Sequence, residues 1–150
     1  MKIVEILLLI IVIASIYYKQ QLEGIDLLFV FSIGLLTNLY FFLGFALFSN
    51  FRIRKLFKSG AIQSKSPLQI VLGFALGVSL AVLLNGVLFM GQMWPNGGAL
   101  ITVGLGMTML LAAALLIFFF IKQEKERIFL TMLLRALLFI VVGLYYFPSF

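Results

Sequence analysis

The sequence predicts an all-α membrane protein with five transmembrane helices, arranged as two tandem helical hairpins and a C-terminal helix. Hydrophobic side chains make up 64% of the 150 residues and charged ones 11%, whereas soluble domains are roughly 45–50% apolar. The apolar residues are gathered in long runs, and a spanning helix needs about 20 of them. Because only short polar segments separate these runs, we expect a single polytopic membrane domain over residues 1–150.

Hairpin 1 is predicted over residues 3–50. Its first run, 3–18, follows Lys2 and is interrupted by Glu5. A short basic start and an apolar centre also fit a signal peptide, but no convincing A-x-A cleavage site follows. The pair Tyr17 and Tyr18 is instead typical of the interfacial end of a retained helix. The second run begins at Ile25 and is long enough to span the membrane with some tilt.

A basic interfacial loop is predicted over residues 51–67. Ile53, Leu56 and Phe57 share one helical face, which predicts a short helix lying on the membrane surface. The basic residues around that face are Arg52, Arg54, Lys55 and Lys58. We expect them to contact anionic lipids, a role favoured over the binding of nucleic acid.

Hairpin 2 is predicted over residues 68–121 and the fifth helix over residues 128–147. Pro67 suits the first position of a helix, where a missing amide hydrogen does no harm. Glycines let another helix approach closely because they lack a side chain. The glycines expected to do so are Gly73, Gly77, Gly104 and Gly106. In the polar turn of this hairpin, Trp94 is expected to join Tyr17 and Tyr18 in an aromatic belt at the outer interface.

The distribution of lysine and arginine predicts the orientation. Segment 51–66 carries five of these residues and segment 122–127 carries three, whereas 19–24 carries one and 92–98 none. Cytoplasmic loops of membrane proteins are enriched in lysine and arginine. We therefore expect the N-terminus and both basic loops to lie in the cytoplasm and the C-terminus outside.

The composition also restricts the chemistry. The chain lacks cysteine and histidine, which removes disulfides, iron–sulfur clusters, imidazole haem ligation and most zinc chemistry. Its five acidic residues lie at or near predicted membrane boundaries, a placement that disfavours a proton relay at depth. Since no catalytic dyad, phosphate-binding loop or metal cluster can be recognised, we expect no enzymatic activity, no cofactor and no metal.

A few polar residues lie inside the apolar runs. Arg135 is the least favourable of them in a membrane, because inserting an arginine at the centre of a helix costs about 2.5–3.5 kcal/mol on insertion scales. We expect it to reach toward the cytoplasmic interface and to pair with Glu5, with an anion or substrate site as the alternative. Asn38, Asn85 and Thr108 are predicted to be buried polar groups, and the two asparagines are expected to form interhelical hydrogen bonds.

An internal repeat is predicted from the order of features along the chain. A shift of 70 residues places residues 32–35 on residues 102–105, and about sixteen mostly apolar residues and a basic boundary follow each segment. The matched order of turn, glycine and basic exit favours a duplication over chance similarity between apolar helices. The two hairpins would then be parallel repeats, unlike the inverted repeats common in transporters.

Residues 86–120, with the Trp94-Pro95 turn and the glycines after it, resemble the two-helix membrane anchor of the gliding-motility motor protein L of Bacteroidota. More closely, the chain resembles small relatives of that protein in which the hairpin occurs twice, and the resemblance covers most of residues 1–121. It implies a location in the bacterial inner (cytoplasmic) membrane and anchor helices that assemble around a partner membrane protein. In that family, such assemblies form a proton-driven motor.

The sequence departs from the motor anchors at their titratable positions. A lysine and a histidine usually stand where this chain has Met90 and Met93, and a membrane-embedded glutamate stands near Thr108 and, in the first repeat, near Asn38. Neither threonine nor asparagine can hold or release a proton near neutral pH. The resemblance therefore implies a retained architecture without the proton-coupling residue.

The leading hypothesis is a non-enzymatic integral membrane protein that serves as a scaffold or accessory subunit of a larger membrane complex. Its partners would be other membrane subunits or further copies of itself, because little of the chain lies outside the bilayer. The alternative is an ion-conducting or motor-like subunit, which would need a polar path lined by residues such as Asn38 and Thr108. An intramembrane enzyme acting on lipid is a weaker possibility, since no acid–base pair is predicted at depth.

Overall fold

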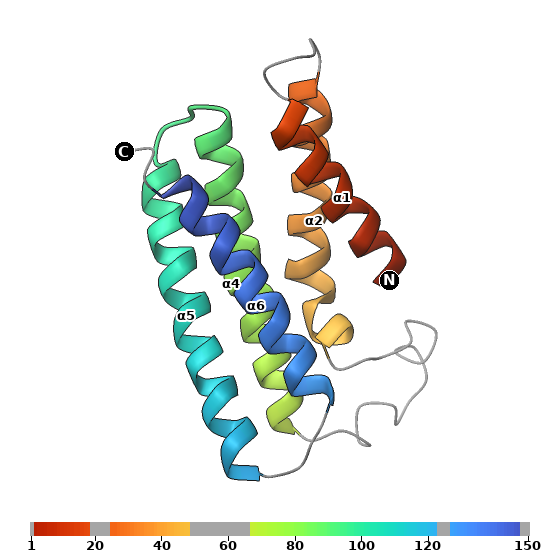
Figure 1. Ribbon diagram of the computed structural model, residues 1–150, viewed down its shortest axis with the longest axis vertical. Helices are drawn as coiled ribbons and strands as arrows, with labels where there is room; N and C mark the ends of the chain where they lie inside the picture. The colour runs from red at the N-terminus through yellow and green to blue at the C-terminus, as the bar shows by residue number, and fades with distance from the viewer. Residues whose placement is uncertain (1, 19–24, 49–66, 123–126, 148–150) are drawn as a thin grey trace.

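The computed structural model describes residues 2–18, 25–48, 67–122 and 127–147. These residues contain five α-helices and no strand (Figure 1). The helices are α1 (Lys2–Tyr18), α2 (Ile25–Phe48), α4 (Pro67–Gly91), α5 (Gly97–Lys122) and α6 (Arg127–Tyr146). Each observed bound lies within about two residues of the predicted one, which is the usual uncertainty of a helix end. The all-α class is therefore confirmed.

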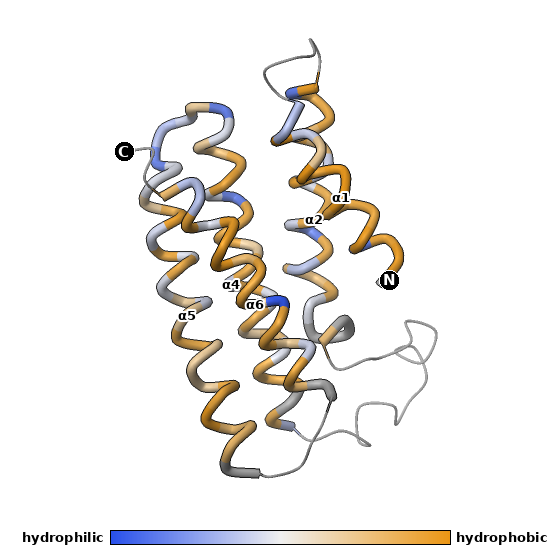
Figure 2. The backbone as a smooth tube through the Cα atoms, viewed as in Figure 1, coloured by the Kyte–Doolittle hydropathy of each residue, from blue (hydrophilic) through white to orange (hydrophobic). Residues whose placement is uncertain are grey.

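Four of the helices contain segments long and apolar enough to cross a membrane, which makes the chain a membrane protein. These segments are Ile25–Gly44, Ile70–Gly91, Gly97–Phe120 and Phe129–Tyr146, and the colour of apolar residues covers much of their helices, with paler and hydrophilic stretches between (Figure 2). The apolar part of α1, Ile3–Tyr18, is shorter. At 1.5 Å of rise per residue it extends about 24 Å, against a hydrocarbon core of about 30 Å. Five full crossings therefore remain a prediction.

Helix α4 lies at the centre of the bundle. In its candidate membrane span, 61% of the residues in the most apolar window are buried, whereas the corresponding share is 28% in α5 and 28% in α6. The two most extensive helix contacts are α2 with α4 and α4 with α5, and α6 packs on α5 and α4. Helix α1 has its extensive contact with α2 alone, so α2 is the element that attaches α1 to the rest of the bundle.

Two glycines form the crossing between α2 and α4. A Cβ atom placed on Gly77 would lie 2.6 Å from the carbonyl oxygen of Tyr40 and 3.0 Å from Cα of Gly44. Such distances leave no space for a side chain, so the two backbones touch here. Gly73 is buried one turn earlier, and its carbonyl oxygen lies 3.6 Å from a Cβ placed on Gly44. The Gly73–Gly77 pair thus faces α2.

The glycines of α5 differ from each other. A Cβ on Gly104 would lie 2.6 Å from Cα of Leu83, so this glycine sets the approach of α5 to α4. A Cβ on Gly106 would meet nothing within 4 Å. The close helix contact expected at Gly106 is not made within the described residues, because two residues turn a helix by about 200°, which prevents both glycines from facing α4.

The turn between α4 and α5 is a Schellman motif that ends one helix and leads directly into the next. The Trp94 amide donates to the carbonyl of Phe89 (2.8 Å) and the Met93 amide to that of Met90 (3.1 Å), the two hydrogen bonds that define the motif. Met93 has the left-handed φ of 54° that the motif requires. The Trp94 ring packs edge-on against Phe89 with centroids 5.2 Å apart. Asn96, with φ 67°, then precedes α5, and its backbone carbonyl accepts a hydrogen bond from the amide of Leu100.

Replacing Met93 with glycine is expected to stabilise the protein. A left-handed backbone is strained for methionine but not for glycine, and Met93 is 94% exposed, so its side chain contributes little packing. The expected gain is about 0.5–1 kcal/mol in the free energy of unfolding, measured by SDS-induced unfolding in mixed micelles. Met93→Ala keeps the strain and should leave stability unchanged. A loss of stability in Met93→Gly would contradict this account.

Candidate functional site

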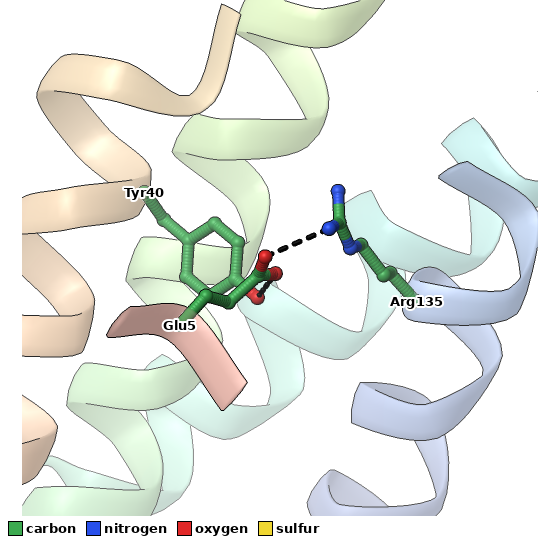
Figure 3. Close-up of polar contacts among 3 residues, drawn as sticks. All are labelled: Glu5, Tyr40 and Arg135. Atoms are coloured by element: carbon green, nitrogen blue, oxygen red, sulfur yellow. Dashed lines mark hydrogen bonds and ion pairs between the residues drawn. The ribbon is translucent and has the colours of Figure 1, made fainter. Parts of the chain in front are cut away.

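The candidate site is a buried carboxylate held by two donors from different helices. Glu5 of α1 is 1% exposed. Its Oε1 accepts a hydrogen bond from the hydroxyl of Tyr40, a residue of α2, at 2.6 Å. Its Oε2 accepts one from Nη2 of Arg135, a residue of α6, at 2.7 Å. Figure 3 shows the glutamate side chain lying between the other two. We call Glu5, Tyr40 and Arg135 the clasp.

Helical periodicity places Glu5 on the inner face of α1. The fully buried residues of α1 are Glu5, Val12 and Ser15, and Leu8, Leu9 and Ile16 pack against the core beside them. This spacing follows one side of a helix, and that side faces α2. Glu5 therefore stands at one end of the only stripe of α1 that the bundle covers, among the described residues.

Aromatic rings enclose the charged groups. Phe48 stacks on Tyr40 with centroids 6.0 Å apart and planes 11° apart, and the guanidinium carbon of Arg135 lies 5.3 Å from the centre of the Phe48 ring. Phe139 meets Tyr40 edge-on at 5.4 Å. Phe48 and Phe139 are both buried. The arginine thus has a carboxylate and a ring face as neighbours, and both attract a cation.

The clasp joins three helices and neutralises its own charge. Both carboxylate oxygens of Glu5 accept a hydrogen bond, so neither charge-bearing atom is left without a donor. Removing one member would leave its partner charged in a largely dry environment. The chemistry of this arrangement is therefore that of a structural ion pair, and it connects α1 to α6, two helices that otherwise lack extensive contact.

No family model, curated protein or solved structure matches the chain. The resemblance to the gliding-motor anchors therefore remains a proposal, and the site is interpreted from its geometry. In the described helices, no group of three or more aspartate and glutamate side chains is placed to hold a metal ion.

The remaining polar residues predicted inside the spans have different environments. Thr108 is fully buried, and its hydroxyl donates to the carbonyl of Gly104 in its own helix at 2.7 Å. Asn85 is half-buried. Asn38 is exposed, and its Nδ2 donates to the carbonyl of Gly34 at 2.8 Å, again within its own helix. The prediction of a buried Asn38 with an interhelical bond inside the chain is wrong, because its helix turns that side away from the bundle.

The two positions that the resemblance aligned with a motor glutamate therefore do not share a surface. Thr108 points into the bundle and Asn38 lies on its outside. The glycines matched by the repeat differ in the same way, since a Cβ on Gly34 would meet nothing within 4 Å while one on Gly104 would meet Leu83. The residues that the predicted repeat matches therefore make different contacts at these positions.

The predicted interfacial aromatics lie at one end of the bundle. Tyr17 and Tyr18, 73% and 43% exposed, end α1, and Trp94, 46% exposed, lies in the turn after α4. Figure 1 shows the end of α1, this turn and the C-terminal end of α6 toward the same end of the molecule. The basic residues Arg52, Arg54, Lys55 and Lys58 lie outside the described residues.

Sequence reasoning paired Arg135 with Glu5 but did not find Tyr40. The tyrosine lies in an aromatic-rich half of α2 beside Phe41 and Phe42, which suggested bulk rather than polarity. One available signal was that a tyrosine deep in an apolar run must find a partner for its hydroxyl if it is buried. The contacts of Phe48 and Phe139 could not be predicted either, since nothing in a uniformly apolar helix identifies which rings face a distant arginine.

Proposed function

We propose that the protein is a non-enzymatic structural or accessory subunit of a larger complex in the bacterial inner membrane. Its membrane helices would serve both to hold the subunit together and to bind its partners. The two roles fall to two different sets of polar residues, the clasp and Asn38.

The clasp supports the first role. Ionisable residues inside membrane spans usually mark a pathway or a reaction site, but here the acidic and basic groups satisfy each other. Together with a tyrosine hydroxyl they connect α1, α2 and α6. A subunit whose membrane charges are used internally is suited to keep one shape while it binds something else.

The observation that carries the second role is the exposure of Asn38. Its amide lies well inside the apolar span Ile25–Gly44, on a surface where the neighbouring exposed side chains are large and apolar. One N–H bonds the helix backbone, which leaves the other N–H and the carbonyl oxygen for another group. Since hydrocarbon offers no hydrogen bonds, this amide favours contact with a further membrane helix.

The proposed orientation keeps the N-terminus and the basic loops in the cytoplasm and the C-terminus outside. The ends of α2 and α5 and the starts of α4 and α6 lie toward one end of the bundle, away from the Trp94 turn (Figure 1). The lysine- and arginine-rich connections therefore leave from the same end, as the charge rule for cytoplasmic loops requires.

Native purification tests the proposed function. The tagged protein, extracted from its own membranes in lipid nanodiscs, is expected to elute as an assembly larger than one chain, with its constituents identified by mass spectrometry. Asn38→Leu should reduce the assembly severalfold, whereas Thr102→Val, which alters another exposed residue bonded to its own helix, should not. A monodisperse monomer without any co-purifying protein would count decisively against a scaffold or subunit role.

A further inference from the structure

The outward face of α2 has the residue pattern of a helix–helix interface. Phe31, Gly34, Asn38 and Phe41 follow one another at intervals of three, four and three residues. This alternation keeps one seam of a helix against a partner helix that crosses it at a small angle. Phe31 is 66% exposed and Phe41 48% exposed, so the described helices of the chain leave the seam uncovered.

Gly34 gives this seam a point of close approach. A Cβ placed on it would meet nothing within 4 Å, whereas Gly44 in the same helix is pressed against α4, with Cα of Gly77 only 2.7 Å from its own added Cβ. One turn separates Gly34 from Asn38, and the asparagine amide bonds the glycine's carbonyl. The space left by Gly34 and the amide of Asn38 therefore lie side by side on the same surface.

We infer that this seam pairs with the same seam of a second copy of the chain, through a parallel contact between two α2 helices. Copies of one membrane protein insert in the same orientation, so a two-fold axis along the membrane normal brings identical residues together at identical depth. Asparagine carries both donors and an acceptor, which makes it complementary to itself. A single asparagine at such a position is known to select pairs of helices in one register.

This inference rests on the proposed function and names the partner that Asn38 contacts. In a symmetric pair, the free N–H of one Asn38 is offered to the carbonyl oxygen of the other. An unrelated partner helix would have to supply a matching polar group at that depth, whereas a second copy supplies it by symmetry. The same exposed amide that is costly in lipid is thereby satisfied.

Disulfide cross-linking in native membranes tests the pairing, because the chain contains no cysteine of its own. Phe41→Cys, which leaves Asn38 in place, is expected to form covalent dimers severalfold faster under mild oxidation than Leu110→Cys or Val141→Cys. These controls replace exposed apolar residues on α5 and α6, 74% and 67% exposed. Adding Asn38→Leu to Phe41→Cys should reduce dimer formation to the control level, and adding Thr102→Val should not.

The outcomes separate this inference from the proposed function. Equal cross-linking in all three cysteine variants, or cross-linking of Phe41→Cys that is insensitive to Asn38→Leu, would overturn the pairing. Co-expression of two differently tagged copies adds a second readout. If the copies fail to co-purify while other membrane proteins do, the second-copy inference fails and the subunit role stands. If nothing co-purifies, both fail. Unchanged thermal unfolding of Asn38→Leu would show that the variant still folds.

Discussion

Glu5→Gln is expected to lower the free energy of unfolding by about 3 kcal/mol, because it leaves the guanidinium of Arg135 without its counter-charge in a mostly buried position. The side chain of Arg135 is 20% exposed and that of Glu5 2%, so solvent compensates little. Glutamine can still accept the Tyr40 hydroxyl, which confines the change to the ion pair. SDS-induced unfolding in mixed micelles measures the loss.

The double variant provides the control. Once Glu5 is neutral, Arg135→Gln removes an unpaired charge rather than a partner, so the pair of changes should cost little more than Glu5→Gln alone. Tyr40→Phe removes only a hydrogen bond to the carboxylate and is expected to cost about 1.5–3 kcal/mol, the usual value for a bond to a charged group. Fully additive losses for Glu5 and Arg135 would show that the 2.7 Å contact carries no coupling.

Gly77→Leu is expected to destabilise the bundle by about 3 kcal/mol or more, since the atoms it would strike belong to backbone and not to movable side chains. The carbonyl oxygen of Tyr40 and Cα of Gly44 lie 2.6 and 3.0 Å from the added Cβ. To accommodate a leucine, α2 would have to move away from α4, and Tyr40 would move with it. The clasp should therefore loosen even though none of its members is changed.

Gly106→Leu is the matched control, because it adds the same side chain to a glycine of the neighbouring helix where nothing lies within 4 Å. Its expected effect is within about 0.5 kcal/mol of zero. Unfolding in mixed micelles compares the two variants, and cross-linking between cysteines introduced on α1 and α6 reports the state of the clasp. Similar losses in both variants would mean that the α2–α4 crossing is less tight than its backbone distances indicate.

The sequence predicted the helix bounds well and the faces of the helices poorly, and both results have the same origin. Helix ends in this chain are marked by residues that differ from the apolar runs, such as Pro67 at the start of α4 and Asn96 before α5. A helix that is apolar on every side does not show which side the bundle covers. Gly104 and Gly106 were therefore predicted alike to pack against a helix, and Asn38 was predicted to be buried, although only Gly104 and Tyr40 face the bundle.

The ion pair was within reach of sequence reasoning because charge is rare in these spans. The chain has five acidic residues, and Glu5 is the one that interrupts a predicted apolar run near the membrane face toward which Arg135 was expected to reach. The tyrosine and the two phenylalanines around the pair could not be selected in the same way, since the chain holds 17 phenylalanines and their facing depends on the crossing at Gly44 and Gly77. That crossing in turn pairs glycines from two different helices, and no local pattern in α2 distinguishes Gly44 from Gly34.

The clasp also has a consequence for how the protein is made. Glu5 precedes Arg135 by 130 residues, so α1 and α2 reach the membrane before the ribosome has finished α6. An isolated α6 would bring its arginine into lipid at a cost of about 2.5–3.5 kcal/mol on insertion scales. If α1 and α2 insert first, the carboxylate and the Tyr40 hydroxyl would already be in place when that helix arrives. The insertion of α6 would thus bring Arg135 to a carboxylate that was synthesised 130 residues earlier.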